Sequence, residues 1–285
     1  MARPSAFHFL PLNDTLPVWA FTGNRELTAA LGRPATKEGR MASPAEKHDA
    51  RLMREMFGTI APRYDFVTRV FSYGQDRRWK RLGVQRASLP DSAMVLDLAC
   101  GTGDFSLIVA RALPRARVVA VDLTPQMLAV ARRRGSAEVV CGDAMALPFA
   151  DGSFDGVFVG YGLRNFPDLA AALAEIHRVT RPGGLMVTLD FFLPAHHLWR
   201  KLYLGYLYAQ GAFWGVLLHG RPGVYTYIPD ALRSFVSIQD FSCLLQRVGY
   251  SQVDVRPYFL GGIALHWAVR LPSADFPRLS LPAGG

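Results

Sequence analysis

The chain has 285 residues, of which 50% are hydrophobic and 19% charged, and this composition excludes a mostly disordered chain. Ordinary numbers of glycine (26) and proline (19) exclude collagen-like and low-complexity classes, and three cysteines without a CxxC pair favour a reducing compartment over a disulfide framework. The net charge of +9 has three candidate explanations, namely nucleic acid, an anionic membrane or solubility.

The N-terminal part differs from the rest of the chain. Five prolines interrupt short apolar pieces in residues 1–47 and no hydrophobic period is sustained, so we expect a poorly ordered extension there. Met41 precedes the first strong helical pattern, and a translation start at this residue is a further hypothesis. No secretory signal pattern is visible. Residues 272–285 are expected to form a tail.

The positive charge is concentrated in the next segment. Residues 48–90 are expected to be helical, because Leu52, Met53, Met56, Phe57 and Ile60 fall on one stripe. Residues 51–90 contain nine Lys and Arg against three Asp and Glu, a net charge of +6. The charge ends in a cluster of Arg77, Arg78, Lys80 and Arg81. This cluster is either a solvated helix face or a surface for the phosphates of lipid or RNA.

Apolar strands and helices then alternate through residues 91–271. The expected strands are 94–99, 117–122, 138–141, 154–160 and 185–192, with helices from 104, from 124 and over 169–180 between them. A helix near 238–248 and strands near 253–256 and 263–269 follow an aromatic insertion at about 192–236. This alternation predicts an α/β fold with a doubly wound, mostly parallel sheet and helices on both faces.

One stretch of the insertion resembles a membrane segment. Residues 202–218 carry no formal charge, but these 17 residues fall short of the length of about 20 that a spanning helix needs. Their glycines and aromatic residues favour a buried or interfacial helix.

A glycine-rich turn follows the first expected strand. Gly101 and Gly103 let the backbone approach a ligand closely, and Asp122 ends the second strand, where a carboxylate accepts hydrogen bonds from ribose hydroxyls. The third glycine of a dinucleotide fingerprint is missing, and Asp104 at the helix start disfavours a pyrophosphate. Asp143 follows the third strand and is a candidate acceptor for the adenine amine.

These carboxylates favour a positively charged cofactor. Asp97, Asp122 and Asp143 around a GxG loop point to S-adenosyl-L-methionine rather than NAD, since a sulfonium brings positive charge and no phosphate. In the alternative reading, Asp97 and Asp104 satisfy only backbone amides of the turn.

Eight segments carry a resemblance to a known family: MFGTIAPRYDF (56–66), VLDLACGTGD (95–104), GDAMALPFADGSFD (142–155), GYGLRNF (160–166), HRVTRPGG (177–184), LDFFLP (189–194), YTYIPDALRSF (225–235) and GGIALH (261–266). The resemblance extends over residues 52–270 and is to the ubiquinone/menaquinone biosynthesis C-methyltransferase family, a branch of the class I S-adenosylmethionine-dependent methyltransferases. It implies a Rossmann-like, seven-stranded sheet and methyl transfer to the ring carbon of a polyprenylated hydroquinone. The implied cofactor contacts are Thr102, Asp122, Asp143, Ala144 and Gly160, with Gly101, Gly103 and Leu123 beside them.

The chain departs from the family pattern at several of these positions. Gly160 stands where serine is frequent, which leaves only a backbone contact, and Asp190 stands where glutamate is usual, which shortens the reach of the carboxylate. Thr68 replaces a frequent asparagine, and Ala231 a frequent serine. The cofactor expectation is unaffected, whereas the identity of the acceptor stays open.

Carbon methylation requires alignment of ring carbon, methyl group and sulfur, and removal of a proton. Asp190 or His266 is the expected proton acceptor, while Arg164 and Asn165 fix the ring; Tyr225 is a further candidate. Alternatively, His266 is an ordinary strand residue and Tyr225 packs over the insertion. No metal site is expected, because no cluster has ligand spacing.

The substrate and the exact function remain open at this point. The acceptor is a benzoquinol, a naphthoquinol or, alternatively, another small apolar molecule such as a phenol, sterol or polyketide. RNA methylation and a role as a non-catalytic subunit compete with these functions, although no nucleic-acid partner is expected. The basic segment and the uncharged stretch predict peripheral contact with an anionic membrane, at its inner, cytoplasmic face. A homodimer is left open.

Overall fold

The computed structural model describes residues 50–136 and 138–271. The expectations for residues 1–47, for a start at Met41 and for the 272–285 tail lie outside the described residues.

A seven-stranded sheet forms the centre of the fold, with the order β3-β2-β1-β4-β5-β7-β6. Its first five strands are parallel, and β7 runs antiparallel to both β5 and β6. The strands are β1 Met94–Leu98, β2 Arg117–Asp122, β3 Glu138–Cys141, β4 Phe154–Gly160, β5 Thr180–Phe191, β6 Tyr250–Tyr258 and β7 Ile263–Arg270. The predicted α/β fold with a mostly parallel sheet is thus confirmed.

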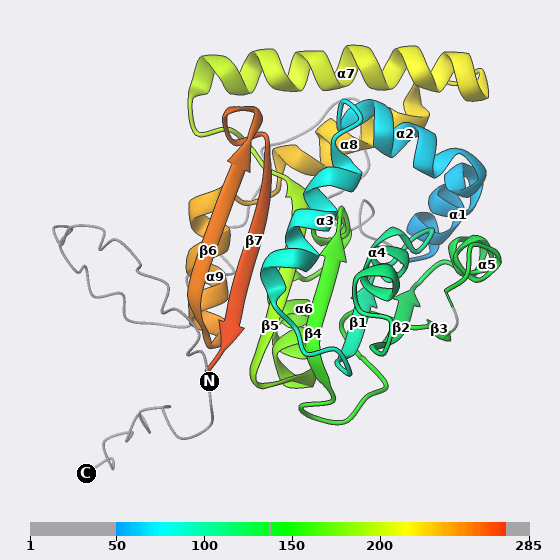
Figure 1. Cartoon of the computed structure of the whole chain (residues 1–285). Coiled ribbons are helices and arrows are strands. Elements are labelled where there is room, and N and C mark those ends of the chain that lie inside the picture. Colours follow the sequence, from blue (N-terminus) through cyan, green and yellow to red (C-terminus); the bar gives the residue numbers. More distant parts are fainter. Residues whose placement is uncertain (1–49, 137, 272–285) are drawn as a thin grey trace, which may run out of the picture. The chain divides into compact units, whose positions relative to one another are not determined.

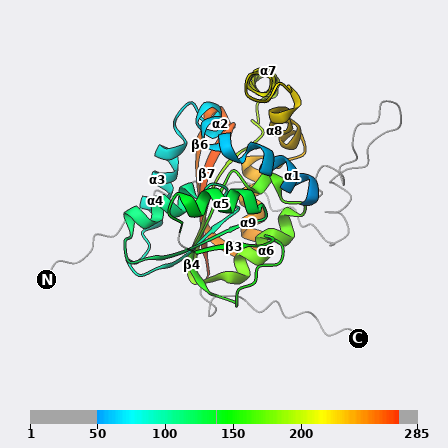
Figure 2. The ribbon, with the colours of Figure 1, turned by 90° about the vertical axis from the view of Figure 1, so that its right-hand side faces the viewer.

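Helices cover both faces of the sheet, as Figure 2 shows. Helices α3 (Asp76–Ala87) and α4 (Asp104–Ala112) bury apolar residues against one face, and α6 (Leu169–Val179) and α9 (Ile238–Val248) against the other. Helix α5 (Pro125–Arg133) packs along β2 and β3, and it begins, as expected, with Thr124 as N-cap and proline in the first turn. Burial on both faces explains why the parallel strands are continuous apolar runs.

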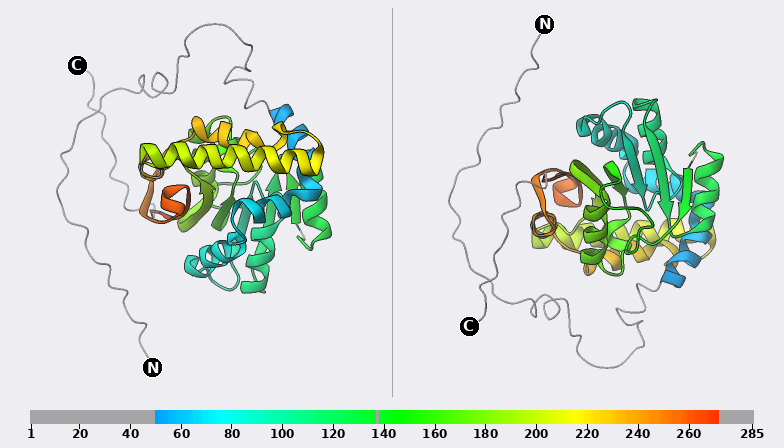
Figure 3. Two further views of the ribbon diagram at one scale, coloured as in Figure 1. Left: turned by 90° about the horizontal axis from the view of Figure 1, so that it is seen from above. Right: turned by 90° about the horizontal axis from the view of Figure 1, so that it is seen from below.

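The remaining helices gather at one end of the sheet (Figure 1). They are α1 (Ala50–Ile60), the 3₁₀ turn η2 (Ala61–Arg63), α2 (Tyr64–Phe71), α7 (His197–His219) and α8 (Gly223–Arg233). Helix α7 lies across this end, and the view from above shows its full length (Figure 3). Two further 3₁₀ turns, η3 (Leu163–Asn165) and η4 (Phe259–Gly261), follow β4 and precede β7.

The insertion after β5 is therefore two helices, α7 and α8. Glycines at their contact let the backbones approach, since a Cβ on Gly211 would lie 3.0 Å from the Tyr225 carbonyl oxygen. Within the described ranges no helix has the length and apolarity needed to cross a membrane.

Candidate active site

The turn between β1 and α4 adopts a backbone that glycine favours. Gly101 and Gly103 have φ values of +54° and +83°. A Cβ on Gly103 would lie 2.5 Å from the Ser136 hydroxyl oxygen, so a side chain there would displace Ser136 and strain the backbone. Helix α4 begins at the next residue, Asp104. The local sequence thus produces a tight strand–turn–helix connection at the carboxyl end of β1.

Asp122 connects this turn to the end of β2. One carboxylate oxygen accepts a hydrogen bond from the Gly101 amide at 2.8 Å, and the other accepts one from the Thr124 amide, also at 2.8 Å. Burial raises the pKa of Asp122, and the two amides partly oppose this shift. Each carboxylate oxygen retains a second lone pair for a ligand hydroxyl.

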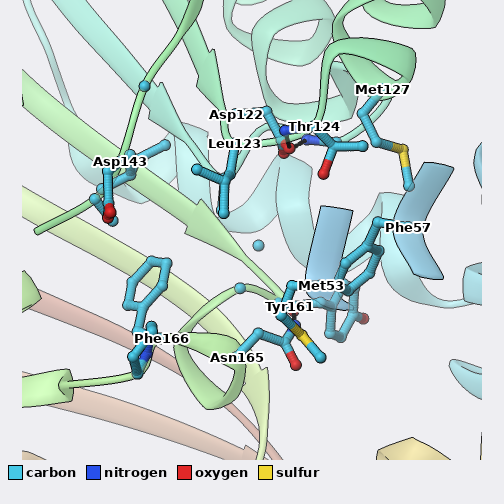
Figure 4. Close-up of a pocket in the computed structure, with 18 of the residues that line it drawn as sticks. Met53, Phe57, Asp122, Leu123, Thr124, Met127, Asp143, Tyr161, Asn165 and Phe166 are labelled. Carbon is cyan, nitrogen blue, oxygen red and sulfur yellow. Dashed lines mark hydrogen bonds between the residues drawn. The ribbon is translucent and has the colours of Figure 1, made fainter. Parts of the chain in front are cut away.

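A pocket opens at the carboxyl ends of β1, β2 and β4. Figure 4 shows Asp122 and Asp143 on one side of it, with Asn165 and Phe166 opposite. The predicted cofactor residues that line it are Gly101, Asp122, Leu123, Asp143, Ala144 and Gly160. The other lining residues are mostly apolar or aromatic: Met53, Phe57, Tyr64, Leu98, Ala99, Thr124, Met127, Gly142, Tyr161, Gly162, Asn165, Phe166 and Pro167.

The lining of the pocket is complementary to a cationic adenosyl ligand. No lysine, arginine or histidine belongs to its lining among the described residues, whereas two aspartates do. Such a lining disfavours a pyrophosphate and favours ribose hydroxyls, an exocyclic amine and a sulfonium. The glycine turn adds close backbone approach, so the residues present fit S-adenosylmethionine.

A smaller pocket adjoins the first and is lined by Lys80, Asp97, Thr102 and Asp104, among others. Lys80 Nζ lies 3.0 Å from an Asp104 oxygen and 3.6 Å from an Asp76 oxygen, and only 4% of Lys80 is exposed. The expectation that Lys80 belongs to a surface cluster with Arg77, Arg78 and Arg81 is therefore wrong. Its ammonium pairs with the buried Asp76 and the partly buried Asp104 instead.

Asp97 and Thr102 reach the site differently from the expectation. Asp97 is buried and accepts hydrogen bonds from the Ser106 amide and hydroxyl, at 2.8 and 2.6 Å, which fits its alternative reading as a turn-stabilising residue. Thr102 donates its hydroxyl hydrogen bond to Asp65. Both line the smaller pocket, and Gly103 lines neither pocket.

Arg164 and Asp190 form a buried ion pair beside the larger pocket. Arg164 Nη1 lies 2.6 Å from an Asp190 carboxylate oxygen and donates a second bond to the Tyr161 carbonyl at 2.8 Å. Asp190 also accepts from the Leu163 and Phe191 amides, and it is fully buried. Burial raises its pKa, and Arg164 opposes the shift. Asp190 does not line the pocket, contrary to the expectation for a proton acceptor, because its oxygens face these donors.

The structure places two further predicted residues away from the pocket. The His266 ring on β7 packs against Phe192 and Phe241, with ring centres 5.2 and 4.9 Å away, and burial lowers its pKa to about 3. Tyr225 is fully buried between α7 and α2, where its hydroxyl lies 2.8 Å from His219 Nε2. Neither lines the pocket, so the alternative readings of both residues as packing groups fit the structure.

The residues ahead of the sheet contribute more than the sequence indicated. Met53 and Phe57 of α1 and Tyr64 of α2 line the pocket, and Phe57 contacts both Tyr64 and Tyr227 edge-on. Tyr64 belongs to the segment 56–66 that carries the family resemblance and is a sequence candidate for the acceptor side, whereas the apolar stripe with Met53 and Phe57 does not by itself distinguish a pocket wall from core. Among residues 50–136 and 138–271, no group of three or more His, Cys, Asp or Glu side chains has the arrangement of a metal site.

Comparison with known proteins agrees with this geometry. Residues 45–270 match the model of the ubiE/COQ5 methyltransferase family. A demethylmenaquinone methyltransferase of Thermus thermophilus is 40% identical over 69% of this chain and 91% of its own length. A ubiquinone/menaquinone biosynthesis C-methyltransferase UbiE of Desulfotalea psychrophila is 38% identical over 76% of this chain and 90% of its own.

Solved structures share the fold at low sequence identity. The YcgJ protein of Bacillus subtilis superposes with a TM-score of 0.52 at 16% identity, covering 69% of this chain and 99% of that chain. At this identity the likeness shows the fold alone, a Rossmann-like α/β sheet covered by helices. With the family model covering most of the chain and the site at the expected strand ends, the chain belongs to the ubiE/COQ5 methyltransferase family.

Proposed function

We propose that this chain transfers a methyl group from S-adenosylmethionine to a ring carbon of a polyprenylated quinol, in menaquinone or ubiquinone biosynthesis. The observation that carries the proposal is a pocket with two aspartates on one side and aromatic and amide groups on the other. The names of the relatives from Thermus thermophilus and Desulfotalea psychrophila support the quinol as acceptor.

On the cofactor side, Asp122 would accept hydrogen bonds from the ribose hydroxyls and Asp143 one from the adenine amine, while Leu123 and Ala144 would pack against the base. The backbone of Gly101 and Gly160 allows close approach, since both lie at the pocket without side chains. Thr102 and the smaller pocket would hold the amino-acid end. When bound, S-adenosylmethionine supplies an electrophilic methyl group on its sulfonium.

On the acceptor side, Asn165 and Tyr64 lie at the pocket and Arg164 lies in the same 3₁₀ turn as Asn165. Burial raises the pKa of Tyr227, and the positive charge of the nearby Arg164 opposes this shift. Arg164 does not line the pocket and is paired with Asp190, so in this proposal the guanidinium holds the η3 turn, and with it Asn165, beside the ring of the acceptor. Asp190 holds the guanidinium in place and is a positioning residue in this proposal.

The test uses the full chain, S-adenosylmethionine and either demethylmenaquinol or a polyprenyl-benzoquinol in phospholipid vesicles. Mass spectrometry is expected to find one added methyl group on the ring of at least one acceptor. Asp122→Ala should weaken binding of S-adenosylmethionine about 10- to 100-fold by calorimetry, and Asp91→Asn, in an exposed ion pair, should not. Cofactor binding without methylation of either quinol would contradict the quinol and favour another apolar acceptor. No cofactor binding would contradict the catalytic role.

We further propose that the chain acts as a peripheral protein at the inner, cytoplasmic face of the membrane. Six exposed apolar residues follow one side of α7, which we call the α7 ridge: Leu198, Leu202, Tyr206, Phe213, Val216 and Leu217. The other large apolar residues that are exposed in the described part are Phe66, Tyr73 and Leu260. The ring centre of Phe66 lies 5.1 Å from that of Trp214 of α7, and the ring centre of Tyr73 lies 5.9 Å from that of Tyr206. Phe66 and Tyr73 therefore extend the same surface.

A contiguous apolar ridge on a helix whose residues 202–218 carry no formal charge fits the headgroup level of a bilayer, where a polyprenylated acceptor resides. Leu202→Gln with Phe213→Gln should reduce binding to phospholipid vesicles about tenfold in a flotation assay, while cofactor affinity and helix content stay unchanged. A second copy of the chain is the competing occupant of the ridge. If light scattering shows that the double variant loses a dimer while its binding to vesicles is unaltered, this result would contradict the proposal that the α7 ridge docks on a membrane.

A further inference from the structure

A basic groove lies between α3 and the end of β6, outside the active site. Its volume is about 550 Å³, and its lining residues are Gln75, Arg78, Trp79, Arg81, Leu82, Gln85, Arg256 and Tyr258. Figure 1 shows α3 and β6 extending toward the end of the molecule where α7 lies. The groove contains part of the excess positive charge of the chain.

Three arginines surround the groove without neutralising partners. Arg78, Arg81 and Arg256 are exposed, and none forms an ion pair with a carboxylate of the described residues. The neighbouring Arg86 differs, because it pairs with Asp254. The three positive charges around the groove repel each other, and an anion bound in the groove would offset this repulsion by attracting all three.

Tyr258 also lines the groove. Its hydroxyl is buried and has no hydrogen-bond partner within the part of the chain that the structure describes. Its ring stacks on Trp79, with ring centres 4.6 Å apart, and the Arg256 guanidinium lies 5.9 Å from the ring centre. Burial raises the pKa of Tyr258 while Arg256 and Arg78 oppose the shift, so both cations act on this ring. A buried hydroxyl without an acceptor is costly, and an oxyanion would supply one.

Aromatic contacts connect the groove to the α7 ridge. Trp79 lies 5.8 Å from Phe259, Phe259 lies 4.5 Å from Tyr73, and Tyr73 stacks on Tyr206 of α7. Exposed Leu260 follows Phe259 in η4. A groove continuous with an apolar surface would face the phosphates of a lipid layer when that surface is inserted.

We infer that this groove is a binding site for the phosphate group of an anionic phospholipid. Arginine suits this ligand because its planar guanidinium donates two hydrogen bonds to one phosphate. The inference rests on the proposed docking of the α7 ridge, and it adds a headgroup preference that the ridge does not supply. Soluble phosphate shares the chemistry, but it would not account for the continuity with the ridge.

The test compares flotation with vesicles of phosphatidylcholine alone and of phosphatidylcholine with phosphatidic acid. The wild-type chain is expected to bind the anionic vesicles at least about tenfold more tightly, since each arginine near an anionic surface contributes about 1 kcal/mol. Arg78→Gln with Arg256→Gln should abolish this preference and leave binding to neutral vesicles unchanged. Arg111→Gln with Arg247→Gln, which removes the same charge from exposed positions on α4 and α9, should retain it.

Separate measurements distinguish the possible failures. Tyr258→Phe should lower the anionic preference a few-fold with the charge intact. An unchanged preference in the Arg78/Arg256 variant would overturn the inference, and so would equal loss in both double variants. Calorimetric binding of inorganic phosphate that is lost in the Arg78/Arg256 variant, while this variant keeps its preference for anionic vesicles, would assign the groove to a soluble phosphate compound. Methylation of a short-chain, soluble quinol should be unaffected in all variants, so its absence would count against the proposed reaction and not against the groove.

Discussion

At the scale of single residues, the buried ion pair between Arg164 and Asp190 is expected to be sensitive to the loss of either partner. Both side chains are almost completely buried, at 3% and 0% exposure. A buried pair contributes little net stability, but removal of one partner leaves an uncompensated charge. Asp190→Asn is therefore expected to lower the free energy of unfolding by about 3–5 kcal/mol, measured by urea unfolding.

A matched control and a kinetic readout separate positioning from proton transfer. Asp91→Asn breaks an exposed pair with Arg115 and should cost less than about 1 kcal/mol. Asp190→Asn should lower kcat about a hundredfold without moving the pH–rate profile, because a displaced Arg164 misaligns the ring. Asp190→Glu, which retains the charge, should recover part of kcat. Loss of one limb of the profile would identify Asp190 as the proton acceptor.

Asp97 gives a pH dependence of stability with a definite sign. Burial raises its pKa from 3.8 to about 6, although the Ser106 hydrogen bonds oppose the shift. Between these two pH values the native state binds more protons than the unfolded state, so the free energy of unfolding falls as pH rises. At about 1.36 kcal/mol per pKa unit the change amounts to about 3 kcal/mol.

Asp97→Asn removes this titration and retains an acceptor for the Ser106 donors. Urea unfolding from pH 4 to pH 7 should therefore show the variant gaining stability relative to wild type as pH rises. Asp104→Asn should show the opposite trend at lower pH, because Lys80 and Arg134 outweigh burial and lower the pKa of Asp104 to about 2. Parallel curves for wild type and Asp97→Asn would contradict the assignment.

Sequence reasoning at this scale was most successful for backbone-determined positions. Gly101, Asp122 and Asp143 follow from strand ends and turn chemistry, and all three line the pocket. His266 and Tyr225 could not be assigned from the sequence, because their surroundings are set by Phe192, Phe241 and His219 from other elements. The prediction that Lys80 is exposed was wrong for the same reason, since its partner Asp104 lies 24 residues away in the sequence.

At the element scale, the glycines of α7 have opposite roles on its two sides. A Cβ on Gly215 would lie 2.5 Å from the Arg221 carbonyl oxygen, whereas one on Gly205 would meet nothing within 4 Å. Gly215→Ala is thus expected to lower the melting temperature, because the backbone of the α7–α8 connection cannot yield. Gly205→Ala should raise the free energy of unfolding by about 1 kcal/mol through helix propensity. Equal effects of the two changes, measured by thermal unfolding, would contradict this packing.

The elements themselves were largely predictable. The apolar runs of β1, β2 and β4 and the Thr124–Pro125 helix start specify their own structure, because a buried parallel strand and a helix N-terminus have local signals. The start of β5 was not predictable: residues 181–184 have the local pattern of a helix stop, yet the strand begins at Thr180. Pairing of Phe154 with Thr180 extends it, and such a long-range contact has no local signal.

At the scale of the whole molecule, the proposed ridge fixes an orientation at the bilayer. Trp214 of α7 contacts Phe66 and Phe213, whereas Trp267 of β7 is buried and donates to the Gly83 carbonyl at 3.1 Å. Two variants are needed, one that retains only Trp214 and one that retains only Trp267, with every other tryptophan replaced by phenylalanine. The fluorescence of each variant then reports on a single position. Lipids brominated on the acyl chain should quench Trp214 fluorescence and leave Trp267 unaffected. Equal quenching would contradict the orientation.

The position of the α7 ridge at the pocket end of the sheet has a kinetic consequence. An enzyme that takes its quinol from a bilayer responds to the mole fraction of quinol in that bilayer, and not to its amount per volume of solution. Added quinol-free lipid should therefore slow turnover at constant total quinol, whereas the dependence on the water-soluble methyl donor should stay unchanged. The rate would then depend on the amount of quinol per membrane area and on the amount of methyl donor per volume of solution.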